Sequence, residues 1–147
     1  LMAFEADLYT WLNTLTGLTA LVGDRIYPGL LPENGTLPAV VYSWLDKDHD
    51  VVDPDTADAN LSNGQLRFSI HAALVDENGI PADAYAAAHA VATQLRLALN
   101  GTKRATLAGI SAVSVTELHT RDAGYDDFTV TYVVEVTAGM HFTESAS

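Results

Sequence analysis

Residues 23–29 read GDRIYPG, and residues 37–42 read LPAVVY. The first segment predicts a short strand at 25–27, which Pro28 and the glycine after it end with a tight turn. The second segment opens a strand at 39–46 that carries apolar side chains on both faces. This pattern predicts a central strand or one that is covered on both sides.

Helices are predicted before and after this tract. Residues 3–15 repeat apolar side chains at helical spacing, and a further short turn of helix is expected at 18–22. Residues 81–99 form a longer, alanine-rich helix, because Pro81 suits the first helical position and Asn100-Gly101 favours a C-cap. So many alanines permit close backbone approach to a sheet or to a neighbouring subunit.

Three more segments alternate apolar and polar residues and are predicted strands, at 65–73, 110–119 and 128–138. The resulting order is α-β-β-β-α-β-β, with short links between the last strands. The fold class is therefore α+β, with a mainly antiparallel sheet and helices packed on one face. We expect a single domain over 1–147, with a frayed tail at 140–147.

One segment, residues 47–62, is too polar for a core and reads KDHDVVDPDTADANLS. Its Pro and Asn residues favour irregular structure, and long loops in compact domains are often functional. We expect a long, acidic and flexible hairpin arm between the second and third strands, and it is the first candidate for contact with a partner. The candidate contact residues are Lys47, Asp48, His49, Asp50, Asp53, Asp55 and Asp58.

The charge of the chain is strongly negative. Nineteen acidic residues stand against seven basic ones, which gives a formal charge of −12 over 147 residues. A surface of that sign disfavours binding to duplex DNA, which depends on phosphate contacts from Lys and Arg. The chain contains no cysteine, so disulfides, thiolate zinc sites and cysteine nucleophiles are excluded. We also expect no membrane span and no signal peptide, because no segment has the required apolar pattern.

Motifs for catalysis or metal binding are weak. The acidic run that starts at Asp53 resembles a calcium loop, but Asp58 and Gly64 stand where that loop requires Gly and Glu. The histidines are scattered, and His71 and His119 are expected to be solvated on the outward faces of strands. No phosphate-binding glycine loop or nucleophile elbow occurs. We therefore predict no cofactor, no metal and no enzymatic activity, although a small enzyme or ligand-binding domain built from distant residues remains open.

Five segments stand in a characteristic order: LTALVGDRIYPG at 18–29, the LPAVVY tract, the strand at 67–72, the helix at 90–101, and DAGYDD at 122–127. In this order they resemble the tail-completion family of long-tailed bacteriophages, also called tail terminators or tail-to-head joining proteins. The resemblance spans nearly the whole chain. The acidic arm departs from it, because that segment is long and individual to this sequence.

The resemblance implies a structural role in a virion. Proteins of this kind assemble into a ring, commonly a hexamer, that caps the completed tail tube and joins the tail to the head connector. The implied partners are further copies of the chain, the tail tube protein and the head-connector or head-completion protein. The implied location is the tail–head junction of a particle assembled in the host cytoplasm. DNA would pass through the ring without sequence-specific binding, and no membrane is involved.

A ring requires contacts between different faces of each subunit. The candidate subunit-interface residues are Arg25 and Tyr27 in the opening tract, together with His89 and Arg96 in the alanine-rich helix. A different ring-forming virion component, such as a head-completion or tail-tube subunit, remains an alternative, because such rings are built from similar sheets.

Overall fold

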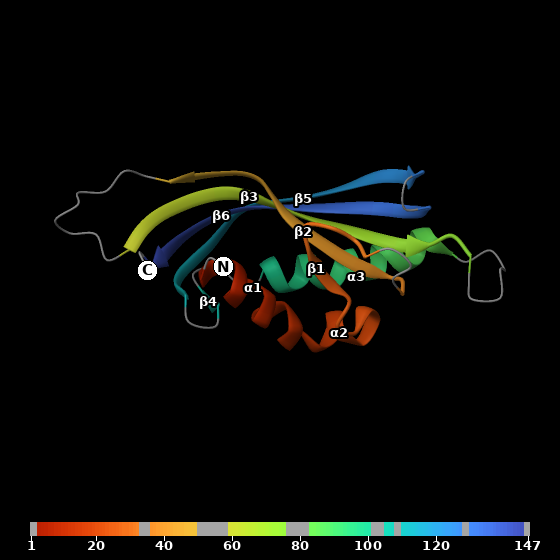
Figure 1. The fold of residues 1–147 in the computed structure, drawn as a ribbon, viewed down its shortest axis with the longest axis horizontal. Coiled ribbons are helices and arrows are strands. Elements are labelled where there is room, and N and C mark those ends of the chain that lie inside the picture. Colours follow the sequence, from red (N-terminus) through yellow and green to blue (C-terminus); the bar gives the residue numbers. More distant parts are fainter. Residues whose placement is uncertain are drawn as a thin grey trace.

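The computed structural model describes residues 3–32, 36–49, 59–75, 83–100, 105–107, 110–127 and 130–145. Within these residues the chain forms three helices and six strands (Figure 1). The helices are α1 (Ala3–Thr14), α2 (Thr16–Val22) and α3 (Ala84–Asn100). The strands are β1 (Ile26–Pro28), β2 (Ala39–His49), β3 (Ala59–Ala73), β4 (Ala105–Leu107), β5 (Ile110–Asp126) and β6 (Thr131–Ser145). The α+β class is confirmed, and the short turn of helix expected at 18–22 is α2, which begins two residues earlier, whereas β4 is an addition to the predicted order.

Local sequence explains where the helices begin and end. α2 ends at Gly23, which has a φ of 60° that residues with a Cβ rarely adopt, and its N–H donates to the Thr19 carbonyl at 2.7 Å. α3 begins at Ala84 rather than at the predicted position 81, because the Asp83 carboxylate accepts a hydrogen bond from the Ala86 N–H at 3.0 Å. No described helix has the length and apolar character needed to cross a membrane.

The strands form one sheet in the order β1-β2-β3-β6-β5-β4. β1 runs parallel to β2 and the other neighbouring pairs are antiparallel, so the sheet is mixed. β3 and β6 pair along their whole length, from Ala73 opposite Thr131 to Ala59 opposite Ser145. β6 therefore continues to Ser145, although the sequence predicts fraying from residue 140. Pairing with β3 supplies the backbone hydrogen bonds that keep this end in the sheet.

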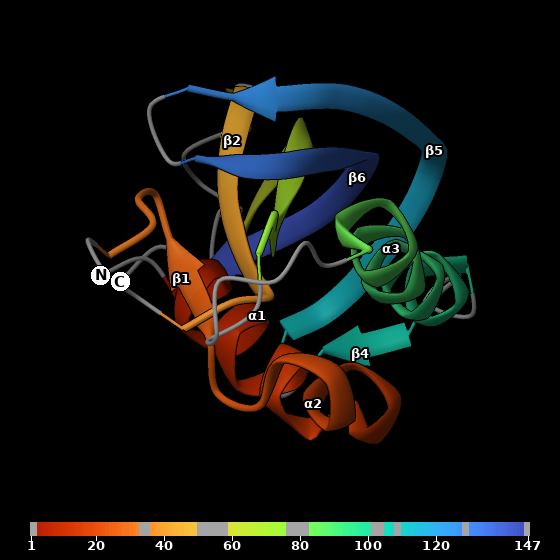
Figure 2. The same ribbon diagram turned by 90° about the vertical axis from the view of Figure 1, so that its right-hand side faces the viewer.

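The core lies between the helices and one face of the sheet (Figure 1). Phe68 and Ile70 of β3, Val136 of β6 and Leu95 of α3 are all fully buried there. Figure 2 shows that β5 curves around α3, so the sheet partly encloses this helix. The helices thus cover one face of the sheet, as predicted, and the described helices leave the other face of the central strands uncovered.

β2 and β3 extend toward the acidic segment beyond their predicted ends. They pair as far as His49 opposite Ser62, so both ends of the expected 47–62 arm are strand. Residues 50–58 lie outside the described residues, and the arm itself therefore stays a prediction.

Candidate functional site

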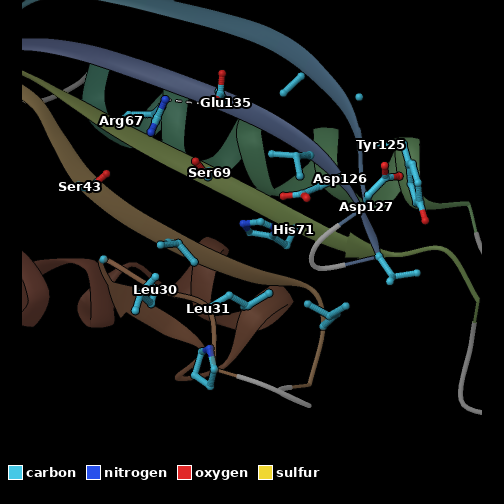
Figure 3. Close-up of a pocket in the computed structure, with 18 residues that line it drawn as sticks. Leu30, Leu31, Ser43, Arg67, Ser69, His71, Tyr125, Asp126, Asp127 and Glu135 are labelled. Atoms are coloured by element: carbon cyan, nitrogen blue, oxygen red, sulfur yellow. Dashed lines mark ion pairs between the residues drawn. The ribbon is translucent and has the colours of Figure 1, made fainter.

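The sheet face opposite the helices contains a groove (Figure 3). Its floor comes from alternate residues of β2, β3 and β6, which point away from the core because side chains alternate along a strand. Its walls are the segment that follows β1 and the end of β5 with its turn. The cavity volume is about 1240 Å³. The lining residues are Gly29, Leu30, Leu31, Pro32, Leu37, Val41, Ser43, Arg67, Ser69, His71, Ala123, Gly124, Tyr125, Asp126, Asp127, Val130, Val133 and Glu135.

A charged network crosses this open face. Arg67 Nη1 of β3 lies 3.5 Å from Glu135 Oε2 of β6 (Figure 3), and Arg121 Nη2 of β5 donates to Glu135 Oε1 at 2.7 Å. Glu135 is the least exposed of the three, so one partly desolvated carboxylate holds two guanidinium groups. Arg67 Nε is buried and has no hydrogen-bond partner among the described residues. An unsatisfied buried donor is a group that an incoming acceptor would satisfy.

His71 lies deeper in the groove. Its side chain belongs to β3 and is only 7% exposed, and its Nδ1 is hydrogen-bonded to Thr131 Oγ1 at 2.9 Å. Burial lowers the pKa of His71 below 6.5, and the nearby Asp126 carboxylate opposes this change. The imidazole is therefore neutral at pH 7. The prediction of a solvated His71 is wrong, because the groove walls remove water from a face that the strand pattern alone leaves open.

Large apolar side chains stand at the rim of the groove. Leu30, in the segment after β1, is 82% exposed, and Tyr125 and Val130 are also exposed at the turn between β5 and β6. The turn uses unusual backbone geometry, with a φ of 86° at Gly124 and 55° at Val130. Exposed apolar groups gathered on one surface are typical of a face that a partner covers.

A second polar cluster ties α3 to β5 and β6. His89 Nε2 of α3 lies 2.6 Å from Asp122 Oδ1 of β5, and the Tyr132 hydroxyl donates to the same oxygen at 3.0 Å. The Tyr85 ring packs on His89 at a centroid distance of 4.3 Å and on Tyr132 at 5.8 Å. Hydrogen bonds from His89 and Tyr132 lower the pKa of Asp122, and burial together with that carboxylate raises the pKa of Tyr132. The cluster fixes the start of α3 against β5 and β6.

The arrangement is suited to recognition. The described residues contain no group of three or more His, Cys, Asp or Glu side chains that could hold a metal ion. The groove instead combines a charged floor, a buried imidazole and an apolar rim. The polar floor and apolar rim reverse the usual order of an apolar centre and a polar rim at protein–protein contacts, so a fitting partner brings polar groups to the floor and apolar groups to the rim.

Comparison with known proteins identifies the family. The family model described as tail completion protein gp17 matches residues 6–137 of the 147-residue chain. The chain belongs to this family. A solved structure of the virion of a native gene transfer agent (GTA) particle contains a similar chain, with 18% sequence identity and a TM-score of 0.59. The match covers 98% of this chain and 96% of that one, and at this identity it shows a shared fold.

No curated protein sequence matches the chain. Membership in the tail completion family nevertheless confirms the resemblance, and it makes the chain a structural protein located in a virion. The groove and the polar cluster are therefore features of a virion component.

The structure places the predicted interface residues of this tail completion protein in different settings. Arg25 donates from Nε to the Pro38 carbonyl at 2.9 Å and from Nη2 to the Leu21 carbonyl at 3.3 Å, so it holds α2 against the start of β2. His89 is engaged inside the subunit by Asp122. Tyr27 lies in β1 at the sheet edge, and Arg96 is exposed on α3. These four residues stay interface candidates, and the structure does not gather them into one patch.

The candidate contact residues of the acidic arm fall into two groups, those at the end of β2 and those outside the described residues. Lys47, Asp48 and His49 form the end of β2, and their side chains are outside what the structure describes. Asp50, Asp53, Asp55 and Asp58 lie outside the described residues. The groove residues Arg67, His71 and Glu135 were not predicted as a site. The alternation of the strand at 65–73 already put Arg67 and His71 on one face, but their partners on β6 depend on the register of two distant strands.

Proposed function

We propose that the chain is a ring-forming tail terminator, which caps the completed tail tube and joins the tail to the head connector. The observation that carries the proposal is the family match over residues 6–137, which spans almost every element of the fold. A tail completion role needs a subunit that binds copies of itself and two different neighbours. The subunit therefore needs several separate contact surfaces.

Free strand edges support this proposal. β1, at one edge of the sheet, has only three residues. At the other edge β4 pairs with β5 only between Ile110 and Val113, so from Val115 to Asp126 β5 has one neighbour among the described strands. Unpaired edges of this length are usually covered by another chain or protected. In a virion a neighbouring subunit is a suitable cover.

The ring is proposed to be a hexamer with DNA passing through its centre. Six copies of a chain with a formal charge of −12 together carry −72. A channel wall that shares the sign of the DNA phosphates would let DNA slide without binding. A density map of the ring with a channel lined by Lys and Arg would contradict this part of the proposal.

The acidic arm at 47–62 is proposed to contact a partner outside the ring, either the tail tube protein or the head connector. Five of its residues are aspartates, at positions 48, 50, 53, 55 and 58. Its described ends continue β2 and β3 beyond the groove, as far as His49 opposite Ser62 (Figure 1). A segment with this charge favours specific and salt-dependent association.

The proposal is tested by deleting the gene in its phage and supplying the protein from a plasmid. We expect the deletion to yield separate full heads and tails, with tails of abnormal length or with open ends, by negative-stain microscopy. The plasmid copy should restore joined particles. Joined, infectious particles in the absence of the protein would contradict the proposal.

Microscopy of the purified protein separates the alternative virion roles. A terminator forms single rings or caps added tail tubes, whereas a tube subunit polymerises into long cylinders. A head-completion subunit would bind isolated heads and leave tubes uncapped. Each of the last two outcomes would replace the proposed role while keeping the protein in the virion.

A further inference from the structure

Two surfaces on opposite sides of the subunit complement each other in shape and charge. The groove lies on the open face of the sheet, and α3 packs on the other face. The outer side of α3 points away from the sheet and is exposed at Tyr85, Ala86, Ala90, Arg96 and Leu97. One subunit therefore presents a concave surface on one side and a convex helix on the other.

The groove is acidic. Its lining contains the carboxylates of Glu135, Asp126 and Asp127 against the single guanidinium of Arg67. Arg121, just outside the lining, adds one positive charge through its bond to Glu135. The acidic excess lies at the turn between β5 and β6, next to the exposed side chains of the rim (Figure 3). A suitable occupant offers positive charge and an apolar side chain.

The outer side of α3 has both properties. Between Ala84 and Thr116 the sequence contains no Asp or Glu, although the whole chain has nineteen. Leu97 is 56% exposed and offers an apolar side chain, and Arg96 is exposed beside it. Ala86 and Ala90 share a helix face with Leu97 by their spacing, so the helix is narrow there and fits a groove.

We propose that the outer side of α3 of one copy docks in the groove of the next copy. Leu97 contacts the apolar rim at Leu30 and Val130, and Arg96 pairs with Asp127. This contact would join neighbouring subunits of the proposed ring, and the inference rests on that proposed function. Because the two surfaces lie on opposite sides of one sheet, the contact is head-to-tail, and such a contact builds a ring when the rotation between successive copies closes. Two grooves facing each other would bring carboxylates together, so a symmetric pairing of grooves is disfavoured.

A charge exchange tests the contact, with the assembly mass of the full chain measured by light scattering and sedimentation. We expect the wild type to form rings. We expect Arg96→Glu to self-associate at least about tenfold more weakly, because a pair of like charges replaces an attractive pair. The double variant Arg96→Glu/Asp127→Arg should restore the ring mass. The matched control Arg96→Glu/Asp24→Arg restores the same net charge at an exposed position outside the groove and should stay dissociated.

Rescue by Asp127→Arg and not by Asp24→Arg supports the proposal. Rescue by neither or by both overturns it, and so does a wild-type protein that stays monomeric at its highest soluble concentration. Circular dichroism of each variant confirms that the subunit is folded.

A mixing experiment tests the head-to-tail geometry. Leu97→Glu disables the helix side and leaves the groove intact, whereas Ser69→Trp fills the groove floor and leaves the helix intact. Each variant alone should be monomeric, and an equimolar mixture should give a one-to-one pair that grows no further. Leu21→Glu, a similar change at an exposed leucine of α2, should keep the ring. Failure of the mixture to associate, or rings formed by either variant alone, would overturn the proposal.

The two proposals can fail separately. Rings that break and recover as described, in a protein whose loss leaves heads and tails joined, would retain the subunit contact and remove the terminator function. Rings insensitive to these variants, in a protein that is required for joining, would retain the function and remove the contact.

Discussion

His71 shows how a single position in the groove acquires its properties. It belongs to a strand of the sheet, yet it is buried on the open face because the segment after β1 and the β5–β6 turn wall the groove on both sides. Desolvation disfavours the imidazolium, so its pKa is below 6.5, and the Asp126 carboxylate offsets part of this effect.

Acidification should therefore destabilise the subunit through His71. The unfolded chain binds a proton near pH 6.5, while the folded chain binds it only at lower pH. The contribution of His71 to the free energy of unfolding is therefore complete above pH 6.5. It falls as the pH drops from 6.5 toward the pKa of the folded state, and it changes no further below that pKa. We expect thermal unfolding of the wild type to lose more stability between pH 7.5 and about pH 5.5 than His71→Gln does. An NMR titration that places the pKa of His71 at or above 6.5 would contradict this.

Asp122 supports a second prediction at this scale. Its pKa lies below 3.8, with the hydrogen bond from His89 as the largest cause and the one from Tyr132 second. His89→Ala should raise the pKa of Asp122 toward 3.8, and Tyr132→Phe should raise it less. His119→Ala, at an exposed position that makes no described contact with Asp122, is the control and should leave it unchanged. The carboxyl carbon shift of Asp122, followed by NMR from pH 2 to about pH 6, measures all three.

Elements of the fold were predictable where local pattern decides them. The alternation at 65–73 and at 128–138 identified two central strands, and apolar spacing identified α1 and α3. Strand lengths were not predictable, because β6 continues to Ser145 through pairing with β3, which lies far away in sequence. β4 was missed for a similar reason, since a strand of three residues has no period of its own.

The contact between α3 and the sheet should dominate the stability of the subunit. Leu95 is fully buried in the core, so Leu95→Ala removes apolar contacts and leaves a cavity. We expect a loss of about 2–5 kcal/mol in the free energy of unfolding, measured by urea denaturation. Leu21→Ala makes the same chemical change at an exposed position of α2 and should cost less than about 1 kcal/mol. Equal losses in the two variants would show that α3 does not hold the core.

The candidate site was harder to predict than the fold. Catalytic motifs, metal motifs and charged segments can be recognised within a short stretch of sequence, whereas the groove joins Arg67, His71 and Glu135 through the register of β3 and β6. Arg25 and His89 were sensible interface candidates from residue type alone. Their bonds to Pro38 and Asp122 depend on segments that only the tertiary fold brings near.

At the scale of the whole molecule, the arm should be separable from the subunit. β2 and β3 remain paired with each other up to His49 and Ser62, so replacing residues 50–58 by an Asn-Gly turn should preserve the fold and the ring. We expect unchanged thermal unfolding and assembly mass, but fewer joined particles when the variant replaces the wild type in the phage. Normal numbers of infectious particles would remove the proposed role of the arm. Loss of the ring would instead assign the segment to contacts between subunits.

The position of β6 bears on when assembly can begin. It is the last of the described strands in sequence, but it occupies the middle of the sheet, between β3 and β5. Before β6 is synthesised, the chain therefore contains two separate parts of the sheet, β1-β2-β3 and β5-β4, with no strand to join them. Such a nascent chain lacks the groove floor at Val133 and Glu135. A chain that stops before β6 would thus lack part of the surface that the proposed contact between subunits requires.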